Sequence, residues 1–429
     1  MGKALIRFIY VVTTYILLPF YVLFWVVKGV FNKTYWDRIG QRFGWNYPKL
    51  GSNSIWIHAV SVGEVQATIP LVKALKIRFP EKNIVITTVT PTGSEQVQKI
   101  FKDQVIHCYI PFEISFAVRN FFNAIKPSLA LIMETEIWPN LYNECGQRNI
   151  LLVLVSAKIS TKSLKNYKRL LPLFRETLSH GILIAAQTKI DAERFVSLGA
   201  DKSKTWVMGN IKFDFNLPAD MGIRGINFRY ENFQDRPVWI AASTHENEEQ
   251  LILNAHKEIL KKISNMLLIL VPRHPERFVK VEQLLKKNKW IYTSRTSGEV
   301  VTKSSKIFLG DTMGELLLLY AASDISFVGG SMIPIGGHNL LEPASLGLPV
   351  LTGTYMFDQK EMTDLLMNAS AASFVRNESE LAERVIFYHK NKEECEVIGK
   401  KAQNIVLKNR GALASLMERL DLLLNDEFI

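Results

Sequence analysis

The chain has 429 residues, of which 48% are hydrophobic and 22% charged, so it is too long for one ordinary domain and is not disordered. Its formal net charge of +11 favours an anionic partner: a phosphorylated substrate, a nucleic acid or an acidic membrane surface. The three cysteines, Cys108, Cys145 and Cys395, form no CxxC or His/Cys metal pattern, and their odd number favours a reduced compartment.

The first segment of the chain is apolar. Residues 8–27 carry no charge, and that is about the length that a helix needs to cross the hydrocarbon layer of a membrane. No small-x-small cleavage site follows, so we expect a retained membrane anchor over residues 1–43 rather than a signal peptide. Pro19 lies within the run and leaves a kinked or half-embedded helix as an alternative to a straight span. The basic residues that flank the run favour a cytosolic location for the following chain: Lys28, Lys33, Arg38 and Arg42 after it, opposed by Lys3 and Arg7 before it.

Short apolar runs alternate with helical spacing along the rest of the chain, which predicts an α/β fold with parallel sheets covered on both faces. The expected strands of the first half are 55–60, 83–89, 105–110, 129–133, 151–156 and 181–187. The expected strands of the second half are 237–243, 266–272, 306–310, 324–330 and 348–353. We therefore expect two facing domains with a cleft between them, and these bounds: domains over 44–215 and 226–404, a linker over 216–225 and a C-terminal helix over 405–429.

Functional residues are expected in the loops that follow the strands, because ligands of open parallel sheets bind beyond the carboxyl ends of the strands. In the first such loop, Ser61 and Gly63 are expected to form a tight turn, and Glu64 opens a helix. A glutamate in a first helical turn complements the helix dipole, which also favours its ionised form. Glu64 is thus a candidate for either a structural or a chemical role.

Two further carboxylates, Glu134 and Glu136, follow a strand that is predicted to be buried. Carboxylates in such a place are costly unless they are paired or take part in chemistry. A structural capping role is the alternative.

The second half has three loops of interest. Two prolines hold a short loop that presents Arg273 and His274, and arginine suits bidentate contact with phosphate. Thr312 and Glu315 have the spacing of a capping box, which would be purely structural.

The third loop, 329–342, contains two Gly-Gly pairs and leads into a helix at Asn339. Glycines let backbone N–H groups approach an anion, and a helix N-terminus favours negative charge. Glu342, one turn into the helix, is placed to accept hydrogen bonds from a ribose diol. The loop therefore predicts a nucleotide-phosphate site.

A basic cluster lies in a probable helix of the first domain: Lys158, Lys162, Lys165, Lys168 and Arg169. A solvated helix face is the simpler interpretation, but in a membrane-tethered protein the cluster also suits the phosphates of an anionic lipid. Nucleic acid is not expected as a partner, since no recognition motif or aromatic platform accompanies these residues.

These loops together resemble the Kdo (3-deoxy-D-manno-octulosonic acid) transferases. The resemblance runs from about Trp36 to the C-terminal helix, and many long motifs in order make it specific. The segments that carry it are IWIHAVSVGEVQA, TTVTPTGSEQVQ, LIMETEIWPNL, FVSLGA, GNIKFD, VWIAASTHENEE, LILVPRHPERF, GDTMGELLLLY and FVGGSMIPIGGHNLLEPA.

The resemblance implies a GT-B glycosyltransferase with two Rossmann-like domains, the first binding the acceptor and the second the nucleotide sugar. The implied donor is CMP-Kdo, and the implied acceptor is a lipid A precursor, lipid IVA, at the cytoplasmic face of the inner membrane. Transfer would invert the anomeric centre and need no metal or other cofactor.

The resemblance also assigns roles to residues. Glu64 would be the general base, and Glu134 with Lys212 would stabilise the transition state. The implied CMP contacts are Arg273, His274, Met313, Gly314, Glu315, Asn339, Leu340, Leu341 and Glu342. The expected acceptor contacts are Ser61, Gly63, Lys158, Lys162 and Lys165.

One departure from the family pattern is that Ser156-Ala157-Lys158 stands where the family often has Asn-Ala-Arg. A lysine keeps the charge of arginine but loses its bidentate geometry, which puts the acceptor contacts there in doubt. Two alternatives stay open at the level of sequence: another GT-B enzyme that uses a UDP-sugar, and a membrane-anchored nucleotide-binding scaffold without catalysis.

Overall fold

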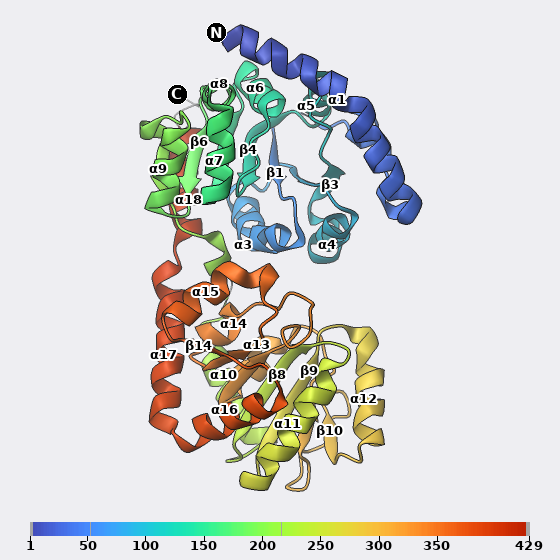
Figure 1. The fold of residues 1–429 in the computed structure, drawn as a ribbon, viewed down its shortest axis with the longest axis vertical. Helices are drawn as coiled ribbons and strands as arrows, with labels where there is room; N and C mark the ends of the chain where they lie inside the picture. The colour runs from blue at the N-terminus through green and yellow to red at the C-terminus, as the bar shows by residue number, and fades with distance from the viewer. Residues whose placement is uncertain (1–2, 52, 216, 426–429) are drawn as a thin grey trace. The chain divides into compact units, whose positions relative to one another are not determined.

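The computed structural model describes residues 3–51, 53–215 and 217–425, and its elements are shown in Figure 1. The chain divides into two compact units, Met1–Phe215 with Arg410–Ile429, and Asn216–Asn409. The outer ends of the expected anchor and C-terminal helix, and the first residue of the expected linker, lie outside the described residues.

The first unit is built on a seven-stranded parallel sheet with the order β3-β2-β1-β4-β5-β6-β7. Its central strands are apolar on both faces, which suits a sheet that is buried by helices on both sides. The strands are β1 Ser54–His58, β2 Ile84–Thr88, β3 Ile106–Tyr109, β4 Pro127–Met133, β5 Leu151–Ala157, β6 Leu183–Ala186 and β7 Thr205–Val207.

Two apolar layers flank this sheet because successive strand residues point to opposite faces. Ile55 and Ile57 contribute to the layer under α3, α4 and α18, whereas Trp56 lies in the layer under α5, α6 and α9. The helices are α2 Ile39–Arg42, α3 Val62–Arg78, α4 Pro91–Phe101, α5 Ser115–Ile125, α6 Pro139–Gln147, α7 Thr161–Arg169, α8 Leu171–Leu178, α9 Lys189–Ser197 and α18 Ala412–Asn425. Short 3₁₀ turns are η1 Lys33–Trp36, η2 Lys102–Gln104, η3 Lys202–Lys204 and η4 Ile211–Phe213.

The second unit repeats the architecture with a seven-stranded parallel sheet of order β10-β11-β9-β8-β12-β13-β14. The strands are β8 Val238–Thr244, β9 Leu267–Pro272, β10 Tyr292–Ser294, β11 Ile307–Leu309, β12 Ile325–Val328, β13 Val350–Thr352 and β14 Ala372–Phe374. The helices and 3₁₀ turns are α10 Met221–Asn232, α11 Glu248–Lys262, η5 Pro275–Arg277, α12 Phe278–Lys287, α13 Leu316–Ala321, α14 Leu341–Ser345, η6 Phe357–Gln359, α15 Lys360–Asn368, α16 Glu378–Lys390 and α17 Lys392–Asn409.

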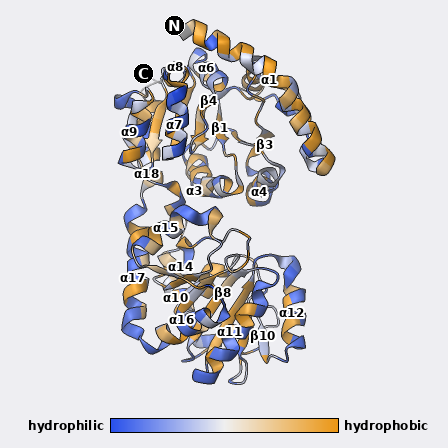
Figure 2. Cartoon of the chain, viewed as in Figure 1, coloured by the Kyte–Doolittle hydropathy of each residue, from blue (hydrophilic) through white to orange (hydrophobic). Residues whose placement is uncertain are grey.

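The N-terminal helix α1, Lys3–Phe31, has the length and composition of a membrane segment. Only 6% of its most apolar window is buried, and most of its ribbon has the hydrophobic colour in Figure 2. Helix α1 is bent rather than straight in Figure 1 and contains Pro19. It fits membrane anchoring, as the sequence predicts.

The α/β class, the two parallel sheets and the apolar N-terminal helix are confirmed, while some local expectations differ. The strands β7, β10 and β14 were not predicted: each has three residues, and unlike β11 and β13 none is buried throughout, so no continuous apolar run marks them. Gly63 lies inside α3 rather than in a turn before it, and α10 begins at Met221, within the expected linker. The expected C-terminal helix over 405–429 is divided between α17 and α18. The break lies at Arg410–Gly411, where Gly411 adopts a φ of 105°.

Candidate active site

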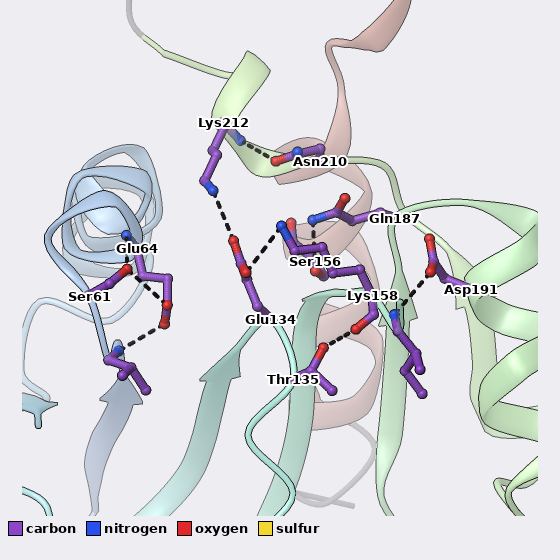
Figure 3. A network of polar contacts seen from close by, with 12 residues as sticks. Ser61, Glu64, Glu134, Thr135, Ser156, Lys158, Gln187, Asp191, Asn210 and Lys212 are labelled. Carbon is purple, nitrogen blue, oxygen red and sulfur yellow. Dashed lines mark hydrogen bonds and ion pairs between the residues drawn. The ribbon is translucent and has the colours of Figure 1, made fainter. Parts of the chain in front are cut away.

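The carboxyl ends of β1, β4, β5 and β6 bring together most of the polar residues singled out in the first half of the sequence. Figure 3 shows Glu64 and Ser61 after β1, Glu134 after β4, and Lys158 at the end of β5. Lys212 comes from η4, which follows β7. Loops that are distant in sequence meet here because all strands of the sheet are parallel.

Glu64 lies in the first turn of α3 and is held by the start of that helix. Ser61 is the N-cap, and its hydroxyl accepts from the Glu64 N–H at 3.3 Å. The Glu64 carboxylate accepts from the Val60 N–H at 2.8 Å and from the Ser61 hydroxyl at 3.0 Å. The sequence S-V-G-E thus folds much like a capping box, which fixes the Glu64 side chain in one direction.

The pKa of Glu64 is raised from 4.5 to about 7. Burial is the main cause, the like charges of Glu134 and Glu136 add to it, and hydrogen bonds from Val60 and Ser61 oppose it. The start of a helix favours the ionised form of a carboxylate, but burial here raises the pKa of Glu64 nonetheless. A carboxylate with a pKa near neutrality is suited to exchange a proton with a bound hydroxyl.

Glu134 has the opposite environment. Its two oxygens form ion pairs with Lys212 Nζ at 2.8 Å and with Lys158 Nζ at 3.2 Å. Burial alone would raise the pKa of Glu134, but the two ammonium groups outweigh it and hold the pKa below its usual value. Glu134 is therefore a fixed negative charge that places two cations at the edge of the sheet.

Glu136 stands apart from this ion-pair group. Its carboxylate accepts from the Trp138 indole N–H at 2.7 Å, and its pKa is raised by burial and by the charge of Glu134. The backbone N–H of Asn140 donates to Glu113, another buried carboxylate, whose pKa burial raises to about 7.

Of the basic cluster, Lys158 alone is paired with Glu134 among the described residues. Lys162 and Lys165 are exposed on α7 and do not join the Glu134 group. Of the expected acceptor contacts, the structure therefore brings together Ser61, next to Glu64, and Lys158, next to Glu134.

In the second unit, the expected phosphate loop follows β12 and is organised by Glu248, which the sequence analysis did not identify. The Glu248 carboxylate accepts from the N–H groups of Gly330 at 2.7 Å, Ser331 at 3.0 Å and Met332 at 2.9 Å. Burial raises its pKa and these three donors oppose the rise. Its position in the first turn of α11 looks like ordinary dipole complementation, which is why sequence reasoning missed it.

Three histidines gather beside this loop. The His245 and His338 rings are stacked with centroids 5.0 Å apart, and their Nε2 atoms are 2.7 Å apart. His274 contacts His245 edge to face at 5.4 Å. Burial and nearby positive charge, including Arg273, lower the pKa of His245 to about 4 and of His338 to about 3. Arg273 and His274 were predicted from the sequence, His338 lies in the predicted loop 329–342, and His245 was missed.

Glu315 does not form a capping box. It precedes α13 and accepts two hydrogen bonds from Arg295, at 3.0 and 2.8 Å, while the Thr312 hydroxyl also donates to it. These interactions lower the pKa of Glu315, and Arg295 is the largest cause. Gly314 adopts a φ of 85°, a conformation that glycine takes readily, and Met313 before it is half-exposed.

The four residues Asn339 to Glu342 lead into α14. Asn339 Oδ1 accepts from the Leu341 N–H at 3.0 Å, and its Nδ2 donates to Glu342 at 3.3 Å. Leu340 and Leu341 are buried. Burial raises the pKa of Glu342, while Asn339 and the charge of Arg273 oppose the rise. A partly buried carboxylate with a single side-chain donor has capacity left for a hydroxyl ligand.

Within residues 3–51, 53–215 and 217–425, no group of three or more His, Cys, Asp or Glu side chains has an arrangement that could hold a metal ion.

Comparison with known proteins identifies the family. A family model described as 3-deoxy-D-manno-octulosonic-acid transferase (kdotransferase) matches residues 37–215. A 3-deoxy-D-manno-octulosonic acid transferase of Haemophilus influenzae is 40% identical over 417 residues, which cover 96% of this chain and 98% of that protein. The chain belongs to the Kdo transferase family. It is therefore a glycosyltransferase.

Further relatives agree with this assignment. A 3-deoxy-D-manno-octulosonic acid transferase of Bordetella pertussis is 33% identical over 344 residues, 77% of this Kdo transferase and 78% of that one. Among solved structures, UDP-GlcNAc 2-epimerase from Neisseria meningitidis bound to UDP-GlcNAc superposes with a TM-score of 0.53 over 86% of this chain and 99% of that chain. Its identity of 16% makes the likeness one of fold, and it supports a GT-B fold with two Rossmann-like units.

The family model covers the loops that carry Glu64, Glu134 and Lys212. It does not reach the second-unit residues, which the full-length relative covers. Three further polar residues lie beside the Glu134 group. Ser156 Oγ accepts from the Ile211 N–H, Asn210 Oδ1 accepts from the Lys212 N–H, and Gln187 Nε2 donates to the Ser156 carbonyl. Ser156 and Gln187 are the last residues of two predicted strands, 151–156 and 181–187, whereas Asn210 follows β7, which was not predicted.

Proposed function

We propose that this Kdo transferase moves Kdo from CMP-Kdo to a hydroxyl group of a lipid A precursor, lipid IVA, in lipopolysaccharide core biosynthesis. The reaction is a metal-independent transfer with inversion at the anomeric carbon. The acceptor binds to the expected domain 44–215, in the first unit, and the nucleotide sugar binds to the expected domain 226–404, in the second. The observation that carries this proposal is the pair of contrasting carboxylates, Glu64 and Glu134, at neighbouring strand ends of the first sheet.

Glu64 is the general base. As the acceptor oxygen attacks the anomeric carbon of Kdo, its proton passes to the Glu64 carboxylate, and the bond from that carbon to the CMP phosphate breaks. The electron pair of the broken bond leaves with CMP. A pKa of about 7 supports this role, because the base is substantially ionised at neutral pH and still basic enough to accept the proton.

Glu134 and Lys212 stabilise the charge that develops during transfer. Two lysines that a partly buried carboxylate fixes in place need no reorganisation when negative charge appears, and such preorganised cations contribute strongly to catalysis. CMP is held in the second unit by Arg273 and His274, by Met313, Gly314 and Glu315, and by residues 339–342. Glu342 accepts from the ribose hydroxyls.

Ser61 and Gly63 bind the acceptor near Glu64. Lys158, Lys162 and Lys165 of the basic cluster also bind it. Lys162 and Lys165 are exposed on α7, which supports contact with the phosphates of an amphiphilic acceptor at a membrane. Lys158 is both an acceptor contact and a partner of Glu134, with which it forms an ion pair.

Helix α1 anchors the enzyme to the inner membrane with both units on the cytoplasmic face. Tyr10 donates to Glu113 at 3.4 Å, and Trp25 packs in a cluster with Phe112 and Ile114. These contacts are 15 residues apart on one helix, which corresponds to about 22 Å. A helix that touches its own domain at both places favours an anchor that lies half-embedded along the membrane surface over one that spans it.

The direct test is to incubate the purified full-length protein with CMP-Kdo and lipid IVA and to measure product masses. We expect lipid products heavier by whole Kdo units, with CMP released in step and no product when UDP-sugars replace CMP-Kdo. Transfer that proceeds from a UDP-sugar but not from CMP-Kdo contradicts the proposal. A reaction without acceptor measures hydrolysis of the donor and serves as the blank.

A further inference from the structure

Two residues at adjacent strand ends of the first sheet have left-handed backbone conformations. Glu134 follows β4 with a φ of 55°, and Ser156 lies at the end of β5 with a φ of 52°. The strands are neighbours, with Met133 paired to Val155. Positive φ is unfavourable for residues other than glycine, and such strain concentrates at functional sites. Glu134 has a role in the proposed chemistry, whereas Ser156 has none so far.

Ser156 is buried, and its hydroxyl both donates and accepts a hydrogen bond. Its Oγ accepts from the Ile211 N–H at 3.0 Å and donates to the Gly209 carbonyl at 3.4 Å. The left-handed turn shifts the pairing register between β5 and β6, and the Ser156 carbonyl accepts from Gln187 Nε2 at 3.1 Å. The side chain therefore joins the end of β5 to the segment 209–211.

That segment carries Lys212. The Lys212 N–H donates to Asn210 Oδ1 at 3.0 Å, so the start of η4 is held on one side by Asn210 and on the other by Ser156. From this turn the Lys212 ammonium reaches Glu134 at 2.8 Å. A lysine side chain is flexible, so the position of its ammonium group depends on how firmly its backbone is held. The 209–211 turn therefore sets the position of the Lys212 ammonium group.

We propose that Ser156 is a positioning residue for the transfer reaction, which holds Lys212 against Glu134 through the 209–211 turn. This inference rests on the proposed function of the Glu134–Lys212 pair. It also gives a reason for a strained, buried serine at a position where a glycine would adopt the same backbone without cost.

Replacing Ser156 by glycine separates this role from a merely structural one. Glycine accepts the left-handed conformation more readily than serine, so Ser156→Gly relieves backbone strain while it removes the hydroxyl. We expect kcat to fall roughly 10²-fold, the effect of a displacement of about 1 Å at a catalytic group. KM for CMP-Kdo and the thermal midpoint should stay close to those of the wild type.

Ser156→Asn is the matching rescue. Asparagine tolerates a positive φ and offers both a donor and an acceptor, so it should restore most of the lost kcat. Asn149→Gly is the control, because Asn149 is an exposed left-handed residue just before the other end of β5, and this variant should keep wild-type kcat.

Two outcomes overturn the inference. In the first, Ser156→Gly keeps full kcat. In the second, Ser156→Gly loses both activity and thermal stability, and Ser156→Asn does not restore the activity. Glu134→Gln and Lys212→Met, measured in parallel, separate this failure from failure of the proposed function. If both of those variants keep normal turnover, the transition-state pair is wrong. If they are impaired while Ser156→Gly is normal, only the positioning role is wrong.

Discussion

Glu64 and Glu134 stand at the ends of β1 and β4, which are neighbours in the same sheet, yet their surroundings differ. Glu64 is held by one backbone N–H and one hydroxyl and forms no ion pair with the residues that the structure describes, whereas Glu134 lies between the ammonium groups of Lys158 and Lys212. Both carboxylates are partly buried, so burial acts on them in the same direction. The pKa of Glu64 is raised to about 7, and that of Glu134 is lowered.

The difference shows that the neighbouring cations, and not burial, decide the role of each carboxylate here. A carboxylate that is stabilised only by neutral donors stays close to its protonation midpoint at pH 7 and can accept a proton. A carboxylate between two lysines stays ionised and fixes positive charge in space.

The largest effect is expected from Glu64→Gln, which keeps the size and the helix-start hydrogen bonding of the side chain but removes its basicity. We expect kcat to fall by about 10²–10⁴, the usual contribution of general-base catalysis, with little change in CMP binding. Glu193→Gln, an exposed glutamate on α9, is the control. If Glu64→Gln turns over normally at saturating substrates, Glu134 or Glu136 becomes the leading candidate for the base.

Lys212→Met removes one of the two cations and tests the other side of the comparison. We expect a loss of about 10²–10³ in kcat, the size seen when a preorganised charge-stabilising group is removed. The pKa of Glu134 should rise, since Lys212 is the larger of the two influences that lower it. Lys204→Met, at an exposed lysine of the same unit, should be neutral. Equal activities of the two variants would contradict a catalytic role for Lys212.

The sequence predicted the carboxylates but not their contrast. Strand periodicity placed Glu64 and Glu134 after buried strands, and parallel topology implied that these ends lie at one edge. The raised pKa of Glu64 depends on how deeply the packed loops bury it, which no local pattern encodes. Glu248 was missed for the same reason, because a glutamate in a first helical turn looks alike whether it faces solvent or a neighbouring loop.

Glu342 in the second unit is a third kind of carboxylate, and it should affect binding rather than turnover. Glu342→Ala should weaken CMP-Kdo binding by about 10- to 150-fold, because a hydrogen bond to a charged group contributes about 1.5–3 kcal/mol. Calorimetry with CMP and its 2′-deoxy and 3′-deoxy analogues tests whether Glu342 acts through the ribose hydroxyls. If it does, the wild type should bind both analogues more weakly than CMP. Equal affinity of the wild type for all three ligands would remove the ribose assignment.

The smallest effect concerns the pH dependence of the wild type and two variants. A general base must be ionised to work, so kcat should rise with pH through an acid limb near the Glu64 pKa of about 7. The charge of Glu134 contributes to that raised pKa, and the charge of Glu136 contributes less. Removing either charge makes ionisation of Glu64 easier, and Glu134→Gln also releases the positive charge of Lys158 and Lys212 from its partner.

The residual activity of Glu134→Gln should therefore show an acid limb displaced to lower pH, and Glu136→Gln should show a smaller displacement in the same direction. Both displacements should be a fraction of a pH unit, because burial remains the main cause of the raised pKa. Rate profiles between pH 5 and 9 at saturating substrate measure them. A limb that moves to higher pH in Glu134→Gln would mean that the group titrating in kcat is not Glu64, and the assignment of base and fixed charge to these two carboxylates would have to be reversed.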